Sequence, residues 1–382
     1  CKNRAIPLKT KKVMQEKSVM IQKKDWIVGR RLLLEWFEVH QRALPWRENP
    51  TPYATWLCEI IMQQTRIDQG LRYWNEFLTI WPDVQRLAAA PLDDILKAWQ
   101  GLGYYSRARN LHLAARIIAS DRKGKFPTNA AEWRTMPGVG PYTAAAISSI
   151  CLGERVAAID GNVLRVISRL LGIEEPIDRP AGRKQIEAFS DEWLDDIDPG
   201  KHNEAVMELG ATVCTPRAPQ CSECPLASIC KSDQANVGST PSIPRKAGKT
   251  KVQNMNLTFH VVTDGQHIWM RQRPENGVWG GLWEFPSHVE SDGDEYTSPP
   301  LPPREMGAAT VSSQGMWGQS FEHILSHRRI TCRFWLWKPS AGFHPDEGRW
   351  LPWREAHKLA IPRALDRFWL DLEKSQSTNS PH

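Results

Sequence analysis

The sequence predicts a multidomain protein in which an all-α region, with a helix-hairpin-helix and a cysteine-rich loop, precedes a smaller α/β domain. Three observations support this prediction. Apolar residues recur with helical spacing on both sides of a Pro-Gly-Val-Gly turn at residues 137–140. Four cysteines lie between residues 214 and 230. After residue 254 the apolar pattern changes to the alternation that is typical of strands.

The length and charge of the chain limit its class. With 382 residues, it exceeds what one hydrophobic core usually serves. We expect a basic tail at 1–24, a helical region at 25–231, a linker at 232–253, an α/β domain at 254–374 and a tail at 375–382. The net charge is +6, and the eight basic residues and one acid of the first tail account for +7. Because no long apolar segment and no apolar leader occur, we expect a soluble intracellular protein without a membrane partner.

The N-terminal part of the helical region combines a helix with a proline-rich segment. The first predicted helix runs from Asp25, its expected N-cap, to Phe37. Residues 42–47 follow, and the prolines in and after this segment predict an irregular, extended path. Trp46 and Arg47 could stack on and clamp a nucleic-acid base there. Alternatively, Trp46 fills the core and Arg47 pairs with an acid, which the residue types alone favour.

Residues 55–65 predict a helix with one carboxylate, Glu59, among apolar neighbours. Burial raises the pKa of a carboxyl group, and a raised pKa suits a general acid that works near neutrality. A position on the solvated face of the helix fits the pattern equally well.

Two glycines before two tyrosines, in residues 101–105, predict a tight turn that presents aromatic rings. Such rings can wedge between the base steps of DNA. Paired tyrosines are more often part of a core, and the pattern alone does not decide between these roles.

The Pro-Gly-Val-Gly turn lies between predicted helices at 130–136 and 142–150. Unpaired backbone N–H groups at the start of the second helix suit a phosphate oxygen, and such contacts hold DNA without reading its sequence. Asp160 follows this helix, which places a carboxylate beside the phosphate contact. Taken alone, the turn is more often an ordinary loop.

The cysteine-rich loop has the spacing Cys-x6-Cys-x2-Cys-x5-Cys. Thiolates select zinc or an iron–sulfur cluster. Zinc sites usually pair two Cys-x2-Cys units, whereas this loop has only one, formed by Cys221 and Cys224. Residues 202–210, just before the loop, predict a helix that carries Glu204.

The C-terminal domain follows a polar linker rich in Pro, Gly and Ser. Residues 256–262 and 268–273, separated by a turn at Asp264, predict a β-hairpin. A proline-rich loop at 287–305, a strand at 329–337 and helices near Glu355 and Ala364 complete the predicted α/β domain.

Together, these motifs resemble the helix-hairpin-helix DNA glycosylases, and in particular the adenine DNA glycosylases of the MutY type, over about residues 26–369. The resemblance implies an all-α glycosylase core with an iron–sulfur loop, a Nudix-like C-terminal domain, and one 4Fe-4S cluster. It also implies a monomer that acts on double-stranded DNA with adenine opposite 8-oxoguanine or guanine. Its location would be the nucleoid of a bacterium, or the nucleus or mitochondrion of a eukaryote.

The resemblance also assigns roles to individual residues. It implies cluster ligation by Cys214, Cys221, Cys224 and Cys230. It implies catalysis by Glu59, Asp160, Tyr142 and Asn162, and an adenine pocket of Arg42, Leu44, Trp46, Arg47 and Glu204. DNA contacts are implied for Gln63, Gln64, Thr65, Tyr104, Gly138, Val139 and Gly140, and reading of 8-oxoguanine for Leu325, Ser326 and His327.

Two departures from related patterns refine the expectation. Family members usually carry Phe-Ser-His where this chain has Leu325-Ser326-His327. The Arg-Glu-x-x-Glu-Glu helix of Nudix hydrolases is absent from the sequence. Without those carboxylates nothing holds Mg2+ on a pyrophosphate, so the C-terminal domain is interpreted as a reader of DNA.

Two rival functions were compared with this hypothesis. An endonuclease III-like glycosylase and lyase would attack the sugar with a lysine just after the hairpin. That position is Tyr142, and no lysine occurs between Lys125 and Lys184. An iron–sulfur DNA-binding protein without catalytic activity would not need the carboxylates Glu59 and Asp160.

Overall fold

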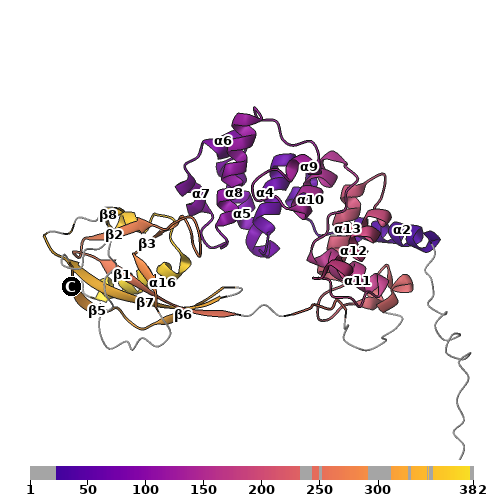
Figure 1. The fold of residues 1–382 in the computed structure, drawn as a ribbon. Coiled ribbons are helices and arrows are strands. Elements are labelled where there is room, and N and C mark those ends of the chain that lie inside the picture. Colours follow the sequence, from indigo (N-terminus) through magenta and orange to yellow (C-terminus); the bar gives the residue numbers. More distant parts are fainter. Residues whose placement is uncertain are drawn as a thin grey trace, which may run out of the picture. The chain divides into compact units, whose positions relative to one another are not determined.

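The computed structural model describes residues 23–232, 243–248, 252–290, 311–325, 328–341, 343 and 347–378. The chain divides into two compact units, and the division does not follow the chain order (Figure 1). The first unit contains residues 1–50, 128–133 and 140–247, and the second contains 51–127, 134–139 and 248–382. The helical region therefore contributes to both units.

The first unit is helical. Its α-helices are α2 (Lys23–His40), α3 (Pro45–Glu48), α9 (Ala130–Trp133), α10 (Pro141–Leu152), α11 (Gly161–Leu171), α12 (Pro180–Trp193) and α13 (Pro199–Thr212). The short 3-10 helices η2 (Cys221–Glu223) and η3 (Ala227–Ile229) lie in the cysteine loop. Asp160 caps α11 by accepting a hydrogen bond from the N–H of Val163, and Asp198 caps α13 in the same way through Lys201.

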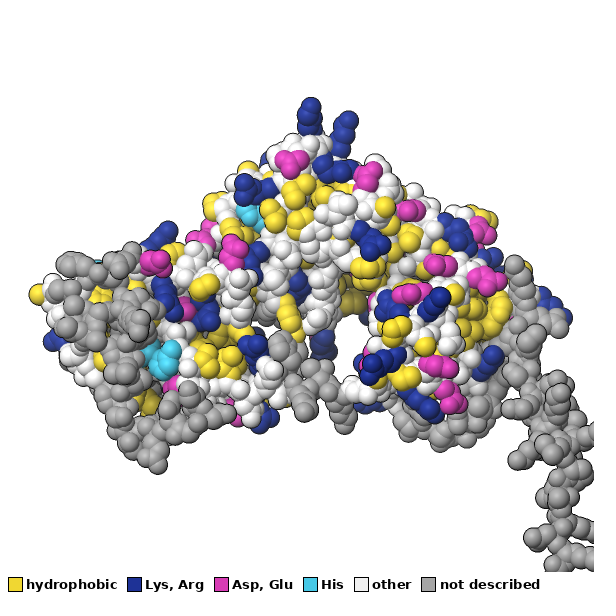
Figure 2. All heavy atoms as spheres, in the orientation of Figure 1, with side chains coloured by type: hydrophobic (Ala, Val, Ile, Leu, Met, Phe, Trp, Pro, Cys, Tyr) yellow, Lys and Arg dark blue, Asp and Glu magenta, His cyan; other side chains and the backbone are white. Residues whose placement is uncertain are grey.

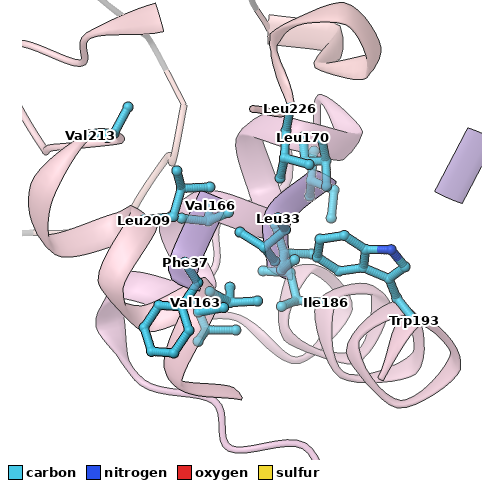
Figure 3. Packing of buried hydrophobic residues seen from close by; sticks show 14 of the residues in the cluster. Leu33, Phe37, Val163, Val166, Leu170, Ile186, Trp193, Leu209, Val213 and Leu226 are labelled. Atoms are coloured by element: carbon cyan, nitrogen blue, oxygen red, sulfur yellow. The ribbon is translucent and has the colours of Figure 1, made fainter. Parts of the chain in front are cut away.

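One apolar core joins α2, α11, α12 and α13 (Figure 3). It includes Leu33, Phe37, Val166, Ile186, Trp193 and Leu209, all at most 4% exposed. Helix α13 approaches α11 closely because it carries Gly210 at the contact. A Cβ atom there would lie 2.6 Å from the Cβ of Asn162, so only glycine fits. This contact brings the last turn of α13 beside the start of α11.

The second unit begins with five α-helices, α4 (Pro52–Met62), α5 (Ile67–Ile80), α6 (Val84–Ala89), α7 (Leu92–Ala98) and α8 (Ser106–Arg116). A π-helical turn, η1 (Ile117–Asp121), extends α8. Trp56, Phe77 and Trp99 are completely buried among these helices. Thr51 starts α4 by accepting a hydrogen bond from the N–H of Ala54, and Pro52 occupies the first turn.

The rest of the second unit is an α/β domain with two sheets. The larger sheet has the order β4 (Ser287–Val289), β1 (Gln253–Val262), β7 (Arg328–Pro339) and β5 (Val311–Met316), and β6 (Phe321–Ile324) also pairs with β7. The smaller sheet has the order β3 (Trp283–Glu284), β2 (His267–Gln272) and β8 (Arg349–Pro352). Helices α15 (Trp353–Ala356) and α16 (Arg363–Thr378) follow, and Phe285, Phe334 and Phe368 form tilted and edge-on contacts in the core.

Several predicted local structures were wrong. Asp25 lies inside the first turn of α2 rather than at its cap. Residues 45–48 form a short helix instead of an extended segment, because proline is well tolerated at a helix start. Strands β1 and β2 belong to different sheets and share only the Thr263–Ile268 bridge among the described residues, so they are not a simple hairpin.

Part of the predicted linker is packed against the first unit. Ile243 is 8% exposed, and its carbonyl accepts a hydrogen bond of 2.9 Å from Arg169. The carbonyl of Arg245 accepts one from the N–H of Ile177 at 3.0 Å. A composition rich in Pro, Gly and Ser did not distinguish this ordered segment from a linker.

No helix among the described residues is long and apolar enough to cross a membrane. In the view of Figure 2, Lys and Arg side chains are interspersed with Asp and Glu over both units. This mixed surface agrees with the charge distribution of the sequence, in which the excess of positive charge belongs to residues 1–24.

Candidate active site and nucleic-acid interface

Asp160 is held at the start of α11 by hydrogen bonds to both of its oxygens. Its Oδ1 accepts from the N–H of Val163 at 2.8 Å, and its Oδ2 accepts from the side-chain amide of Asn162 at 2.7 Å. Arg165 in turn donates to the side-chain carbonyl oxygen of Asn162 at 2.8 Å, which fixes the orientation of that amide. The structure therefore brings the predicted pair Asp160 and Asn162 together, with the carboxylate at the positive end of a helix.

Burial raises the pKa of the Asp160 carboxyl group, and the hydrogen bonds from Val163 and Asn162 oppose this effect. The result is a carboxylate that is desolvated and oriented at the same time. A desolvated negative charge interacts more strongly with a developing positive charge than a charge in water does.

A second cluster in the same unit joins the segment before α3 to α13. Arg47 donates to Glu204 at 2.9 Å and to Glu208 at 2.9 Å. Arg42 forms a bidentate pair with Glu208, with distances of 2.7 and 2.8 Å, and its backbone N–H donates to the same carboxylate. Leu44, the N-cap residue of α3, is 8% exposed, and Trp46 is half-buried on that helix.

The pKa values of the two glutamates of this cluster shift in opposite directions. Glu208 is only 1% exposed. Burial alone would raise its pKa, but hydrogen bonds from Arg42 and Arg47 outweigh burial and lower the pKa. Burial raises the pKa of Glu204, because its interactions with Arg47 do not outweigh desolvation. Glu208 is therefore a fixed charge, and Glu204 is the carboxyl group more able to hold a proton.

Glu208 was absent from the sequence-based candidates, although a signal for it exists. It lies one helical turn after Glu204, and residues four apart share a helix face. Arg42 and Arg47 need two carboxylates between them, and the sequence offers both on this face of α13.

The predicted hairpin is present between α9 and α10. The carbonyl of Met136 accepts a hydrogen bond of 3.1 Å from Val139, and Gly138 has φ +77°. A Cβ atom on Gly138 would lie 2.8 Å from the Cβ of Asn110, so a side chain there is excluded. Gly140 is the N-cap of α10, and within this described segment no side chain caps the helix. A helix start without a side-chain cap is the kind of site that suits an anion.

Tyr142 lies in the first turn of α10, and its hydroxyl group donates to the sulfur of Met207 at 3.4 Å. Its ring packs against a small apolar cluster of Ala145, Ala146 and Ala158. The position just after the hairpin is thus filled by an aromatic side chain.

In the second unit, Glu59 is half-buried in the last turns of α4. The helix ends at Met62, so Gln63, Gln64 and Thr65 form a turn after it and not its continuation. Gln64 has φ 56° and is exposed. The predicted helix was therefore too long by three residues.

The Gly101–Tyr105 turn presents one ring and buries the other. Tyr104, with φ 48°, is 38% exposed, whereas Tyr105 is 6% exposed. The prediction of two presented rings was half correct, and Tyr104 is the accessible one.

A pocket of about 410 Å3 in the second unit brings Tyr104 together with Leu325. Its other lining residues come from the segments 101–109 and 277–280, together with His323, Ile324, Arg328 and Arg363. Arg109, Arg328 and Arg363 supply positive charge, and no acidic residue is among the described lining residues. The predicted readers Ser326 and His327 lie outside the described residues.

The four cysteines of the loop lie near one another in the first unit. Burial, followed by the proximity of Cys214, Cys230 and Cys221, raises the pKa of the Cys224 thiol to about 12. Arg169 donates to the Cys214 sulfur at 3.2 Å. Three of the thiols pack against the apolar core.

The chemistry of the four thiols bears on the kind of metal centre that the loop can hold. Among the described residues no three His, Cys, Asp or Glu side chains converge on one metal position. Four thiolates around a cluster bind different iron atoms and stand farther apart than the ligands of one zinc ion. Four thiols in one loop, with the Arg169 cation beside Cys214, fit an iron–sulfur cluster.

Family models match three parts of the chain. Residues 57–194 match the HhH-GPD superfamily of base excision DNA repair proteins. Residues 214–230 match the iron–sulfur binding domain of endonuclease III, and residues 257–371 match the NUDIX domain. A solved thermostable thymine-DNA glycosylase aligns over 56% of this chain and 100% of its own, with a TM-score of 0.53 and 25% identity. The fold and site thus define a helix-hairpin-helix base excision DNA glycosylase, an enzyme that hydrolyses N-glycosyl bonds.

Curated relatives identify the family more closely. Adenine DNA glycosylase of Mus musculus is 31% identical over 399 residues, which cover 90% of this chain and 77% of the relative. The Homo sapiens protein of the same name is 30% identical, over 88% of this chain and 72% of its own. The chain belongs to the adenine DNA glycosylase family, and its cysteine loop binds a 4Fe-4S cluster.

Proposed function

We propose that this protein excises adenine that is paired with 8-oxoguanine or guanine, and that it is a monofunctional glycosylase acting as a monomer. Its expected location is wherever the cell keeps its DNA. The main observation in support of this proposal is that the Asp160 carboxylate is desolvated and is oriented by Asn162 at the start of α11.

Cleavage of an N-glycosidic bond requires a proton on the leaving base and stabilisation of a positively charged sugar. In our proposal Glu59 protonates a ring nitrogen of the adenine. Asp160 stabilises the sugar cation, and Tyr142 supports that charge from the hairpin side. Water then completes the reaction and leaves an abasic site.

The cluster of Arg42, Arg47, Glu204 and Glu208 supports a role in recognising the flipped base. Arg47 can donate a hydrogen bond and Glu204 can accept one, and the two groups are in contact with each other. The Watson–Crick edge of a purine can be bound by a donor and an acceptor that lie side by side. Leu44 and Trp46 supply the apolar surface against which a base can stack. The 4Fe-4S cluster takes no part in the bond cleavage of this scheme. The four cysteines would hold it, and Arg169 donates a hydrogen bond to one of them, Cys214.

For recognition of the opposite base, the 410 Å3 pocket is the supporting observation. It offers the Tyr104 ring and the Leu325 side chain as apolar surfaces and three arginines for phosphates. We propose that 8-oxoguanine is read by Leu325, Ser326 and His327, with Ser326 as the polar contact. Residues 257–371 match the NUDIX domain, but their sequence lacks the carboxylates of the hydrolase helix. This difference supports a recognition role for the domain over a hydrolytic one.

The test is single-turnover release of adenine from a duplex with adenine opposite 8-oxoguanine. Asp160→Asn should retain binding and lose at least about a hundredfold in rate, because the shape remains while the charge is lost. Glu59→Gln should be at least as damaging, since Gln cannot donate the proton. Near-normal turnover by either variant would place the corresponding function on another residue.

Borohydride trapping tests the monofunctional assignment. A lyase forms a Schiff base with the sugar, which borohydride converts to a covalent complex. Little or no trapping is expected because Tyr142 occupies the relevant position. Robust trapping would favour the endonuclease III-like alternative.

A further inference from the structure

Arg107, in the first turn of α8, is 7% exposed and no role has been assigned to it so far. One of its terminal nitrogens, Nη1, lies 3.1 Å from the carbonyl oxygen of Ile60 and 2.8 Å from that of Ile61. It also contacts the carbonyl of Gln63 and lies 3.2 Å from the hydroxyl of Thr65. The three carbonyls belong to the end of α4 and to the turn after it, and the last carbonyls of a helix have no partner within the helix.

The other terminal nitrogen of Arg107 contacts a different segment. Nη2 lies 3.3 Å from the carbonyl oxygen of Leu102 and 3.2 Å from that of Gly103. The guanidinium group also lies near two aromatic rings, 5.1 Å from the centre of Trp99 and 5.8 Å from that of Tyr104. One planar cation thus joins two segments that lie about forty residues apart in the sequence, with donors on both edges.

Both segments have the same unusual feature at their tips. Gln64 and Tyr104 have φ values of 56° and 48°, in the left-handed region that residues other than glycine seldom adopt. Such conformations persist only where surrounding contacts hold them. Both tips are exposed, and Arg107 contacts the carbonyl of the residue that precedes each of them, Gln63 and Gly103. Burial lowers the pKa of Arg107 to about 10, so it remains charged at neutral pH.

We propose that Arg107 is a positioning residue that locks the turn after α4 and the Gly101–Tyr104 turn into one rigid element, so that Gln64 and Tyr104 enter a DNA duplex together. The inference rests on the proposed function, because it gives these two tips a role in opening the duplex. It adds that the two tips act as a pair and that the protein controls their spacing through one side chain.

A double-mutant cycle on DNA binding tests this pairing. The probe is a duplex with a stable abasic-site analogue opposite guanine, which is bound but not cleaved. Dissociation constants are measured for Gln64→Ala, Tyr104→Ala and the double variant, first with Arg107 and then in the Arg107→Lys background. With Arg107 present, the loss of DNA affinity in the double variant should differ by about five- to tenfold from the product of the losses in the two single variants. A difference of this size is expected for two residues that act as a unit. With lysine at this position, the losses should multiply to within about twofold, because an ammonium group cannot bridge both segments.

Controls separate positioning from general stability. Arg116→Lys changes an exposed arginine on the same helix and should leave the coupling intact. Leu111→Val perturbs the buried face of α8 and should lower the melting temperature without removing the coupling. Persistent coupling in the Arg107→Lys background, or its absence with Arg107 present, would overturn the proposal.

A measurement on the unaltered protein covers the case in which Arg107→Lys does not fold. The Thr65 amide donates to the carbonyl of Met62, and the Arg107 amide donates to that of Tyr104. If the two turns form one rigid element, hydrogen exchange should give both amides the same opening free energy at each denaturant concentration. Two distinct openings would contradict the locked pair. Failure of the proposed function would look different from failure of this inference. The wild-type protein would release no adenine from any mispair, but the coupling between Gln64 and Tyr104 and the common opening of the two turns would persist.

Discussion

At the scale of single residues, the charges of the proposed base pocket depend on one buried acid. Glu208 holds Arg42 through two guanidinium nitrogens and also holds Arg47. Buried charges are costly unless they are paired, and removing one partner leaves the other unpaired. Glu208 therefore sets the geometry with which Arg47 and Glu204 can meet a base.

Glu208→Gln should reduce adenine release by at least about thirtyfold, since truncating one partner of a buried, hydrogen-bonded charge pair costs about 2–5 kcal/mol. The loss should appear in single-turnover rates and in affinity for an adenine-containing mispair. Glu48→Gln removes an exposed acid from α3 and should behave like the wild type. Equal effects of the two variants would argue against a special role for Glu208.

The pH dependence of the reaction should follow the environment of Asp160. Only its ionised form stabilises a cation, and burial raises its pKa, so activity should fall as pH decreases through that raised value. Asn162→Ala removes a hydrogen bond to the charged form, which raises the pKa further. We expect the acidic limb of the single-turnover rate to move to higher pH by about one unit, as one such bond to a charged group is worth about 1.5 kcal/mol. An unchanged or downward-shifted limb would show that another group controls it.

At the scale of secondary structure elements, α13 connects the pocket to the cysteine loop. It carries Glu204 and Glu208 and ends at Thr212, two residues before Cys214. Arg165 of α11 donates to the Cys214 carbonyl at 2.7 Å and also contacts Asn162. The loop that binds the cluster is therefore tied directly to both of these helices.

The purified protein should be brown, with broad visible absorbance near about 400 nm, from charge transfer between thiolate and iron. Cys224→Ser should lose iron and absorbance, and its melting temperature should fall because a cluster that binds only the folded state stabilises it. Cys332→Ser alters a buried cysteine of β7 outside the loop and should keep full colour. A colourless wild-type protein with one zinc per chain would contradict the cluster assignment.

The positions of elements were predictable where the sequence signal is local. The glycines at 138 and 140 marked the hairpin, because a turn of this kind needs a residue that tolerates positive φ. Tertiary contacts were not predictable in the same way. At the end of α4, Arg107 donates to the carbonyls of Ile61 and Gln63, although it lies more than forty residues away in the sequence. The pairing of β1 with β7 in parallel, rather than with β2, is also long-range.

The candidate site could be predicted only in part for the same reason. Asp160 and Asn162 are two residues apart, so their contact is nearly dictated by the start of a helix. Arg42 and Glu208 lie 166 residues apart, and no local pattern links them. The resemblance to a known family supplied most of the individual roles, and these remain predictions until they are tested.

At the scale of the whole molecule, the α/β domain is attached to the helices of its own unit. Lys97 of α7 donates to the carbonyls of His357 and Leu359 at 3.1 and 3.0 Å, and Gln100 donates to Asp366 at 3.1 Å. Arg109 of α8 contacts the carbonyls of Gly280 and Glu275. Deleting residues 254–382 would expose these polar groups and their packed surroundings, so point variants are the sharper test of recognition.

Ser326→Ala should lower the preference for adenine opposite 8-oxoguanine over adenine opposite guanine by a few-fold, because one hydrogen bond is worth about 1 kcal/mol. Leu325→Phe should leave this preference intact or increase it, since an aromatic ring stacks on a base better than Leu does. Single-turnover rates on the two duplexes give the ratio directly. If deletion of residues 254–382 left the ratio unchanged, the C-terminal domain would not be the reader.

The left-handed backbone at Gln64 and Tyr104 has a consequence for anyone who engineers this enzyme for heat resistance. Glycine adopts such a backbone without strain, so Gln64→Gly and Tyr104→Gly would each relieve a cost of about 1 kcal/mol or more. A search guided by stability alone would select both changes. The selected enzyme would survive heating better and repair DNA worse, since the side chains it discarded are the ones that reach into the duplex in our proposal. Natural sequences often keep such unfavourable residues where activity requires them, and these two positions mark where durability and activity compete in this molecule.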